Sequence, residues 1–267
     1  MTSNKFDIIH TRIQRASTHR DELATIQTEY LNQHPIATSI EEHHDHVIIR
    51  FHATAPFPHA ASILFGEWLY NLRAALDGLY YQLMMEDTGL NPPPNATRLT
   101  YPITTSRGQF DTNRDIKRLA NRHQIAIEHT QPYHSTGGHT GSALWWVHHL
   151  ARLDRHRHTH LLVWRVKHIK FESSTNRIDL NRVGNNNRRS IYIRHNQDSQ
   201  PITIPIYPIT MPGTNDHITI RRTIELDIPD WADNAPHSYS IFPLMERMAN
   251  AEQVIHATVD SFTTPQP

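Results

Sequence analysis

Hydrophobic residues in the first half of the chain recur every three or four positions, which is the spacing of an amphipathic helix. They predict four helices, at residues 6–30, 60–86, 111–128 and 143–158. The second would be about seven turns long. Its apolar stripe is wide enough for the helix to be nearly buried. Ser142 stands where its side chain can cap the fourth helix.

Other segments alternate between apolar and polar residues, which is the period of a β-strand. The runs 37–42 and 47–54 flank the polar turn His43-His44-Asp45 and predict a hairpin. Later strands are predicted at 161–171, 190–194, 202–209 and 218–228. Arg222 is the exception on the apolar face of the last one. A final helix is predicted at about 239–262.

These elements predict an α+β protein, in which a bundle of four or five helices packs with an antiparallel β-sheet formed mainly by the C-terminal half. We expect a mainly helical core with the hairpin at 1–160 and a β-rich region at 161–236. The C-terminal helix, at 237–267, would return to the core. One compact unit is the expected organisation.

Composition narrows the class of protein. Among 267 residues there is no cysteine, which excludes disulfides, thiolate metal sites and thiol chemistry. No apolar run approaches the roughly 20 residues that cross a bilayer. The first twenty residues lack the continuous apolar stretch of a secretion signal. We therefore expect a soluble, cytoplasmic protein without a membrane partner.

The formal net charge is zero, but the charges are unevenly distributed. Between His148 and His195 there are eleven Arg or Lys residues and only three acidic ones. Such a stretch is typical of a surface that attracts nucleic acid or another phosphate-bearing ligand. The alternative is a solvated β surface whose charges are compensated by acidic elements of the fold.

Four motifs follow one another between residues 62 and 163. They are Asn71-Leu-Arg-Ala-Ala-Leu-Asp77, Tyr101-Pro-Ile103, Gln131-Pro-Tyr133 and Leu150-Ala-Arg-Leu-Asp-Arg-His-Arg157. The series resembles a family of uncharacterised bacterial proteins in which Lys is usual at the position of Arg155. That family often has His where this chain has Tyr70 and Gly78, so a role for those histidines does not carry over. The family has no established activity, and the resemblance therefore implies positions rather than a reaction.

Polar residues interrupt the apolar helix 60–86 and follow the end of the helix 143–158. Asp77 lies four residues after Arg73, close enough to pair with it on a helix. If the two helices pack, a carboxylate, an imidazole and a guanidinium could converge, a set that suits phosphate binding and proton transfer. The predicted ligand-binding residues are Asn71, Arg73, Asp77, Asp154 and Arg155, and the predicted catalytic residues are His156, Arg157 and His160. The alternative is a structural polar cluster that fixes helix packing in a non-catalytic interaction protein.

The favoured hypothesis is an anion- or nucleic-acid-binding protein, with an RNA-cleaving enzyme as the competing class. The spacing of Arg155 and His160 resembles the Arg and His of HEPN-type metal-independent ribonucleases, which are helical bundles. In those enzymes the two residues act on a phosphodiester and its 2′-hydroxyl. The β-rich half of this chain is not part of such a fold.

A metal site is the third hypothesis. His156 and His160 have the i, i+4 spacing of zinc ligands, but Arg157 stands where zinc proteases have Glu. The histidines of the predicted hairpin could also chelate a metal, although a hairpin tip is simply a polar place. The sequence therefore assigns no metal and no cofactor. The Walker lysine loop, the glycine fingerprint of dinucleotide-binding proteins and the nucleophile elbow of hydrolases are also missing from the sequence.

Overall fold

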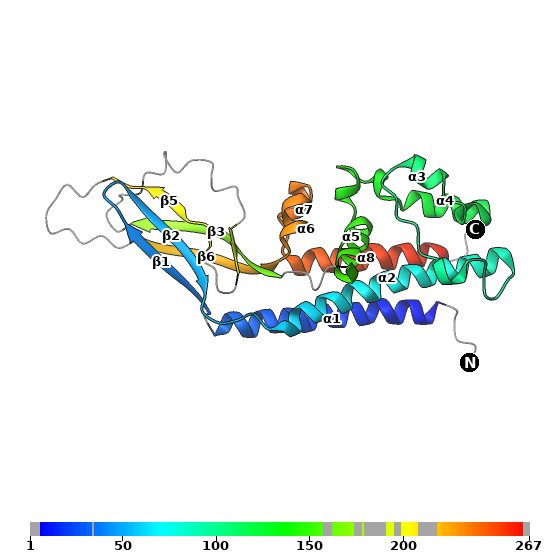
Figure 1. The fold of residues 1–267 in the computed structure, drawn as a ribbon, viewed down its shortest axis with the longest axis horizontal. Coiled ribbons are helices and arrows are strands. Elements are labelled where there is room, and N and C mark those ends of the chain that lie inside the picture. Colours follow the sequence, from blue (N-terminus) through cyan, green and yellow to red (C-terminus); the bar gives the residue numbers. More distant parts are fainter. Residues whose placement is uncertain are drawn as a thin grey trace. The chain divides into compact units, whose positions relative to one another are not determined.

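The computed structural model describes residues 6–33, 35–156, 162–173, 178, 191–194, 199–207 and 218–263. Within these residues it contains helices and two antiparallel three-stranded sheets, so the predicted α+β class is confirmed (Figure 1). The contacts of the chain group it into two compact units. Unit 1 comprises Met1–Ala24, His59–His160 and Asp230–Pro267, and unit 2 comprises Thr25–Pro58 and Leu161–Pro229.

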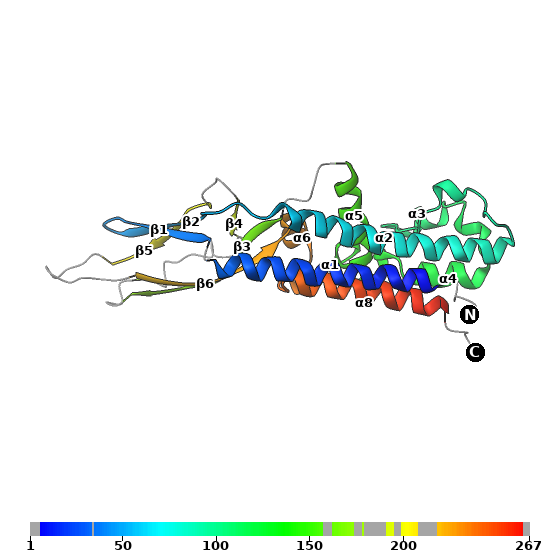
Figure 2. The same cartoon turned by 90° about the horizontal axis from the view of Figure 1, so that it is seen from below.

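Long helices form the frame of unit 1. They are α1 (Asp7–Asn32), of which the first part belongs to this unit, α2 (His59–Thr88), α5 (Ala143–His156) and α8 (Leu244–Thr263). Helix α2 packs against α5 and α8, and α5 packs against α8. The second and fourth predicted helices therefore do pack together, which is the condition on which the predicted site depends. Helices α1 and α8 run side by side (Figure 2).

Tryptophan rings fill the centre of unit 1. Trp68 of α2 and Trp146 of α5 lie 6.3 and 6.0 Å from Trp231, measured between ring centroids. Trp231 comes from the short helix α6 (Pro229–Asn234), and all three side chains are fully buried. Aromatic side chains of this size contribute a large share of the apolar area that stabilises a core. The wide apolar stripe of α2 is therefore explained by neighbours on several sides.

The predicted single helix at 111–128 is wrong. The chain instead forms α3 (Arg107–Asp111), a 3₁₀ turn at Ile116–Arg118 and α4 (Asn121–His129). Asn113 makes the first break, because its side-chain oxygen accepts hydrogen bonds from the main-chain N–H groups of Asp115 and Ile116. Such local bonds compete with helix continuation.

The second break in this segment is made from outside it. The Asp87 carboxylate, near the end of α2, accepts a hydrogen bond of 2.7 Å from the main-chain N–H of Ala120. The same oxygen lies 2.7 Å from the ring Nδ1 of His123. Helix α4 therefore starts beside a carboxylate supplied by another helix, which periodicity alone does not reveal.

The final helix starts later than predicted. A separate short helix, α7 (His237–Ser240), precedes α8, which begins at Leu244. Pro243 stands immediately before α8, where its missing N–H costs nothing. Its carbonyl accepts a hydrogen bond from the N–H of Arg247. The predicted start at residue 239 is therefore wrong.

Unit 2 contains the strands. One sheet has the order β1-β2-β5, from β1 (Ile36–Glu42), β2 (His46–Ala53) and β5 (Ile202–Pro205). The other has the order β4-β3-β6, from β4 (Ile191–Ile193), β3 (Val163–Ser173) and β6 (Ile218–Asp227). All pairs are antiparallel, and the predicted hairpin is confirmed by the pairing of Glu42 with Val47.

The core of unit 2 contains the apolar face of β2 and two stacked rings. The buried β2 residues are Val47, Ile49 and Phe51. Tyr30 stacks on Trp164 with 4.8 Å between ring centroids. Arg222, the charged residue on the apolar face of β6, lies 5.2 Å above the Phe51 ring and donates to the carbonyl of Ile36. Its position is explained by this stacking and hydrogen bond.

None of the described helices combines the length and the apolar character that a membrane crossing needs.

Candidate functional site

The first two sequence motifs meet at a buried ion pair. Arg73 of α2 is only 5% exposed, and its Nη2 lies 2.8 Å from Asp77 Oδ1, one helical turn away. The same nitrogen donates a hydrogen bond of 2.7 Å to the carbonyl of Tyr101, whose own N–H donates to Asp77 Oδ1 at 2.8 Å. The predicted pairing of Arg73 with Asp77 is therefore confirmed, and the pair holds the main chain of Tyr101 on both sides.

The third motif joins the same network through Gln131. Its buried side chain donates from Nε2 to the carbonyls of Pro102 and Ile127, each at 3.0 Å. Its Oε1 accepts the N–H of Thr104 at 2.9 Å. These bonds fix the segment that follows Tyr101 against the end of α4. Three of the four motifs thus form one hydrogen-bonded block.

Burial shifts the pKa of both members of the ion pair. It lowers the pKa of Arg73, and the nearby positive charge of Arg155 adds to this effect, while Asp77 opposes it. Burial likewise raises the pKa of the Asp77 carboxyl, against the opposing effects of Arg73, the Tyr101 N–H and Arg155. Both charges lie where water solvates them poorly, and an added opposite charge interacts more strongly there than at the surface.

Two polar atoms of this region are left without a hydrogen bond. Nη1 of Arg73 is buried and has no partner among the residues that the structure describes. Within the described residues, the buried Nδ1 of His148 on α5 also has no hydrogen-bond partner. A buried polar atom without a partner costs on the order of 1–3 kcal/mol. Each of them is therefore a place where a ligand atom would be stabilised.

Burial and nearby positive charges lower the pKa of His148. Its pKa is lowered from 6.5 to about 4, first by burial and then by Arg73, Arg152 and Arg155. The imidazole is consequently neutral at neutral pH. Guanidinium groups from α2 and α5 therefore both act on the His148 ring.

The side chains from α5 share one face of that helix. His148, Arg152 and Arg155 are spaced by four and three residues, so they lie above one another. His148 is half-buried, whereas the two arginines are exposed, and Arg155 Nε donates to the carbonyl of Ala151 at 3.3 Å. Sequence analysis missed His148 and Arg152, although this spacing was visible in the sequence.

Two predicted ligand residues lie apart from the ion pair. Asn71 turns back on its own helix and donates to the carbonyl of Glu67 at 2.9 Å. The carboxylate of Asp154 lies over Gly66, where a Cβ would come within 3.1 Å of its Oδ2. Gly66 precedes Arg73 by two helical turns, about 10 Å along α2. Asp154 is thus in a different layer from Arg73 and Asp77.

The side chain of His156 lies outside the described residues, as do Arg157 and His160 entirely. Their catalytic roles stay predictions. The ribonuclease hypothesis, which depends on the spacing of Arg155 and His160, stays a prediction with them.

The basic stretch is partly neutralised within unit 2. Three cations of β3 each face a carboxylate: Arg165 with Asp227 at 2.9 Å, Lys167 with Glu225 at 2.7 Å, and Lys170 with Glu172 at 2.8 Å. The first two carboxylates come from β6, the neighbouring strand. At these positions the charge excess predicted from sequence is compensated. Arg177, Arg182, Arg188 and Arg189 lie outside the described residues.

The surroundings of Arg73 therefore combine three guanidinium groups with one paired carboxylate and a neutral imidazole. This arrangement can accept oxygen atoms that carry negative charge. Comparisons with protein-family models, curated proteins and solved structures gave no match.

Proposed function

We propose that this protein binds an oxyanion, such as the phosphate group of a small ligand, between α2 and α5. Arg73 would bind it from below, His148 from the side, and Arg152 and Arg155 from the exposed rim. The observation that carries the proposal is the buried Nη1 of Arg73, which has no hydrogen-bond acceptor in the described part of the chain.

The charge balance supports an anion rather than a cation or a neutral ligand. Arg73, Arg152 and Arg155 all act electrostatically on His148, and Asp77, the acidic partner of Arg73, is already engaged by the Tyr101 N–H. A guanidinium presents several N–H donors in a fixed plane, and an oxyanion can accept two of them at once. Binding would satisfy atoms that folding has already removed from water.

Burial supports a small ligand or a terminal group rather than a long polyanion. Arg73 is 5% exposed, so only a compact group could reach its Nη1. The described cations of β3 are already paired with carboxylates, which weakens their attraction for nucleic acid. The family resemblance is consistent with this site, because Arg73, Asp77 and Arg155 are all motif positions.

The proposal is tested with sulfate as the probe, on the full chain. Sulfate is compared with chloride at equal ionic strength, by calorimetry and by the shift in melting temperature. We expect sulfate to bind and to raise the melting temperature, because a ligand of the native state stabilises it. Arg155→Gln should weaken binding by about tenfold, which is about 1.4 kcal/mol.

The matched control is Arg15→Gln, which removes the same charge from an exposed position on α1. It should leave sulfate affinity unchanged. Equal affinities in wild type, Arg155→Gln and Arg152→Gln would contradict the proposal, and so would the absence of any sulfate effect. Mass spectrometry of small molecules released on denaturing the purified protein would then identify the natural anion.

A further inference from the structure

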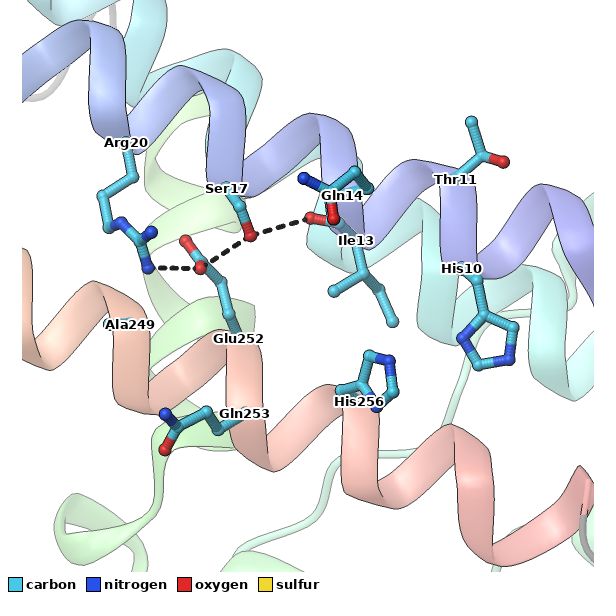
Figure 3. Close-up of a pocket in the computed structure, with 10 residues that line it drawn as sticks. All are labelled: His10, Thr11, Ile13, Gln14, Ser17, Arg20, Ala249, Glu252, Gln253 and His256. Atoms are coloured by element: carbon cyan, nitrogen blue, oxygen red, sulfur yellow. Dashed lines mark hydrogen bonds and ion pairs between the residues drawn. The ribbon is translucent and has the colours of Figure 1, made fainter.

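A second polar region of unit 1 lies between α1 and α8. These helices flank a cavity of about 620 Å³ (Figure 3). Its polar lining includes His10, Ser17, Arg20, Glu252, Gln253 and His256. The two ends of the cavity differ in how completely their polar groups are paired.

The end near Glu252 is closed by direct bonds. Arg20 Nη1 lies 2.6 Å from Glu252 Oε2, and the Ser17 hydroxyl donates to the same oxygen at 2.9 Å. The other oxygen accepts the indole N–H of Trp68 at 2.8 Å. Both carboxylate oxygens therefore have donors, and this end needs no ligand.

The opposite end gathers two imidazoles and a carboxylate. His256 Nδ1 lies 2.8 Å from Asp260 Oδ2, one turn further along α8, and His10 Nε2 of α1 lies 3.8 Å from Asp260 Oδ1. The two rings come from neighbouring helices, with 5.2 Å between their centroids and an angle of 50° between their planes (Figure 3). One possible ligand atom from each residue lies within 4.8 Å of the other two.

We infer that His10, His256 and Asp260 form a binding site for a divalent transition metal of the zinc class. Zinc binds imidazole nitrogen and carboxylate oxygen at roughly 2.0–2.2 Å, so the donors of a tetrahedral site are about 3.3 Å apart. The distances from His256 and His10 to Asp260, 2.8 and 3.8 Å, lie on either side of this value, and they involve the two different carboxylate oxygens. The side chains of His10, His256 and Asp260 are 33%, 52% and 46% exposed, and small rotations can bring them to it.

The donor set selects the class of metal. Magnesium and calcium prefer shells of oxygen atoms, whereas two imidazoles favour zinc and its neighbours in the transition series. Three protein ligands leave a fourth position for water or for a group entering from the cavity. The metal would also connect the first long helix of unit 1 to the last.

Metal-free full-length protein is titrated with Zn²⁺ in competition with a coloured chelator, and Co²⁺ is added separately to report the coordination geometry. We expect one tight equivalent, the intense visible absorption of four-coordinate cobalt, and a higher melting temperature with zinc. His256→Ala should lose this equivalent. The affinity should fall beyond the roughly 10–100-fold that loss of an outer-shell partner costs.

Asp260→Asn is the second variant, because it keeps the shape of the side chain while removing the charge. Both positions are exposed enough that the metal-free variants should keep the wild-type circular dichroism. The control is His46→Ala at the β1–β2 hairpin, where His43 and His46 stack beside Glu41 and Asp45. It should leave the tight equivalent in place.

Unchanged zinc affinity and stoichiometry in His256→Ala and Asp260→Asn would overturn the inference. Loss of the tight equivalent in His46→Ala instead would overturn it too, because the metal would then belong to the hairpin. Sulfate affinity should be the same in His256→Ala as in wild type, so this test is independent of the proposed anion site.

Discussion

Two of the buried charged residues of unit 1, Glu252 and Arg73, differ in how many of their polar atoms have a hydrogen-bond partner. Glu252 receives donors on both oxygens, from Trp68, Ser17 and Arg20. Arg73 uses Nη2 twice, but its Nη1 has no partner in the part of the chain that the structure describes. A charge whose bonds are complete holds helices together, whereas one with a spare donor can also bind a ligand. The comparison separates a structural cluster from a candidate site.

The largest effect should come from removing the fully paired charge. Glu252→Ala would leave the buried Trp68 N–H without its acceptor. It would also remove the acceptor of Arg20 Nη1, while Asp21 still accepts from the other two nitrogens of that guanidinium. Breaking a buried ion pair in this way costs about 3–5 kcal/mol of the free energy of unfolding. Urea denaturation followed by circular dichroism measures this loss.

Glu246→Ala on the same helix is the control. Glu246 is exposed in the first turn of α8, and its loss should cost less than about 1 kcal/mol. Similar losses in the two variants would mean that Glu252 is not the structural node that its contacts indicate. Sulfate affinity of the folded fraction should be unchanged in both.

A smaller loss of stability, with a gain of affinity, is expected from Asp77→Asn. The amide oxygen can still accept from the Tyr101 N–H and from Arg73 Nη2, and the side chain at position 77 is 28% exposed. The free energy of unfolding should therefore fall by less than in Glu252→Ala, by about 2–3 kcal/mol. Removing the carboxylate should strengthen sulfate binding several-fold, because it removes the negative charge nearest to Arg73. Calorimetry with sulfate and thermal denaturation measure the two effects separately.

The chain offers a matched control in Asp111→Asn. Asp111 pairs with Arg107 at 3.0 Å in the same i, i+4 geometry, but on an exposed face. Neither stability nor sulfate affinity should change appreciably there, since exposed pairs contribute little. Weaker sulfate binding in Asp77→Asn would show that Asp77 orients Arg73 for the anion rather than opposing it.

The next effect depends on pH and on His148. Its pKa is lowered from 6.5 to about 4 in the folded protein, so the folded state disfavours the protonated ring. The resulting stability is fully present above pH 6.5 and is lost as the pH falls through about 4. The shift sets an upper limit of about 3 kcal/mol, and solvent screening of the half-buried ring reduces our expectation to about 1–2 kcal/mol.

His148→Gln should flatten this part of the pH dependence of the melting temperature, whereas His129→Gln at an exposed position should not. Sulfate, whose charge is constant in this range, should bind more tightly as the pH falls from 7.5 to 5, because it stabilises the imidazolium. The strengthening should disappear in His148→Gln. If it persists there, the proton taken up with the anion goes elsewhere.

The smallest effect concerns the contact between Gly66 and Asp154. Gly66→Ala gains up to about 1 kcal/mol of helix propensity but places a Cβ 3.1 Å from the Asp154 carboxylate, which must move. We expect a net change within about 0.5 kcal/mol. In an Asp154→Ala background the same substitution should stabilise by about 0.5–1 kcal/mol. Additive effects in the double variant would show that the contact between position 66 and Asp154 does not affect the free energy of unfolding.

Periodicity predicted the long helices, the hairpin and the later strands, because their burial is set by neighbouring side chains along the same element. It also predicted the pair of Arg73 and Asp77, whose i, i+4 spacing is local. It failed where a distant group intervenes. The start of α4 depends on Asp87 of another helix, and sequence spacing contains no trace of that contact.

The candidate sites show the same limit. The sequence predicted that Arg73 and Arg155 would converge, but the i, i+4, i+7 spacing of His148, Arg152 and Arg155 did not show that His148 and Arg152 belong near Arg73. His256 and Asp260 form a recognisable pair on α8, yet their partner His10 comes from the other end of the sequence. Spacing along the sequence therefore identifies candidate ligand residues, but tertiary packing determines which of them lie close together.

The hydrogen bonds that Arg73 and Asp77 make with Tyr101 constrain how the sequence of this protein can change during evolution. Both hydrogen bonds are made with the main chain of Tyr101. They therefore fix the position of the backbone there and do not depend on the side chain at position 101. In related chains the Arg and Asp should be inherited together, while the aromatic residue drifts among side chains that fill the same space. A lineage that lost either charge would have to replace both, or re-route the loop.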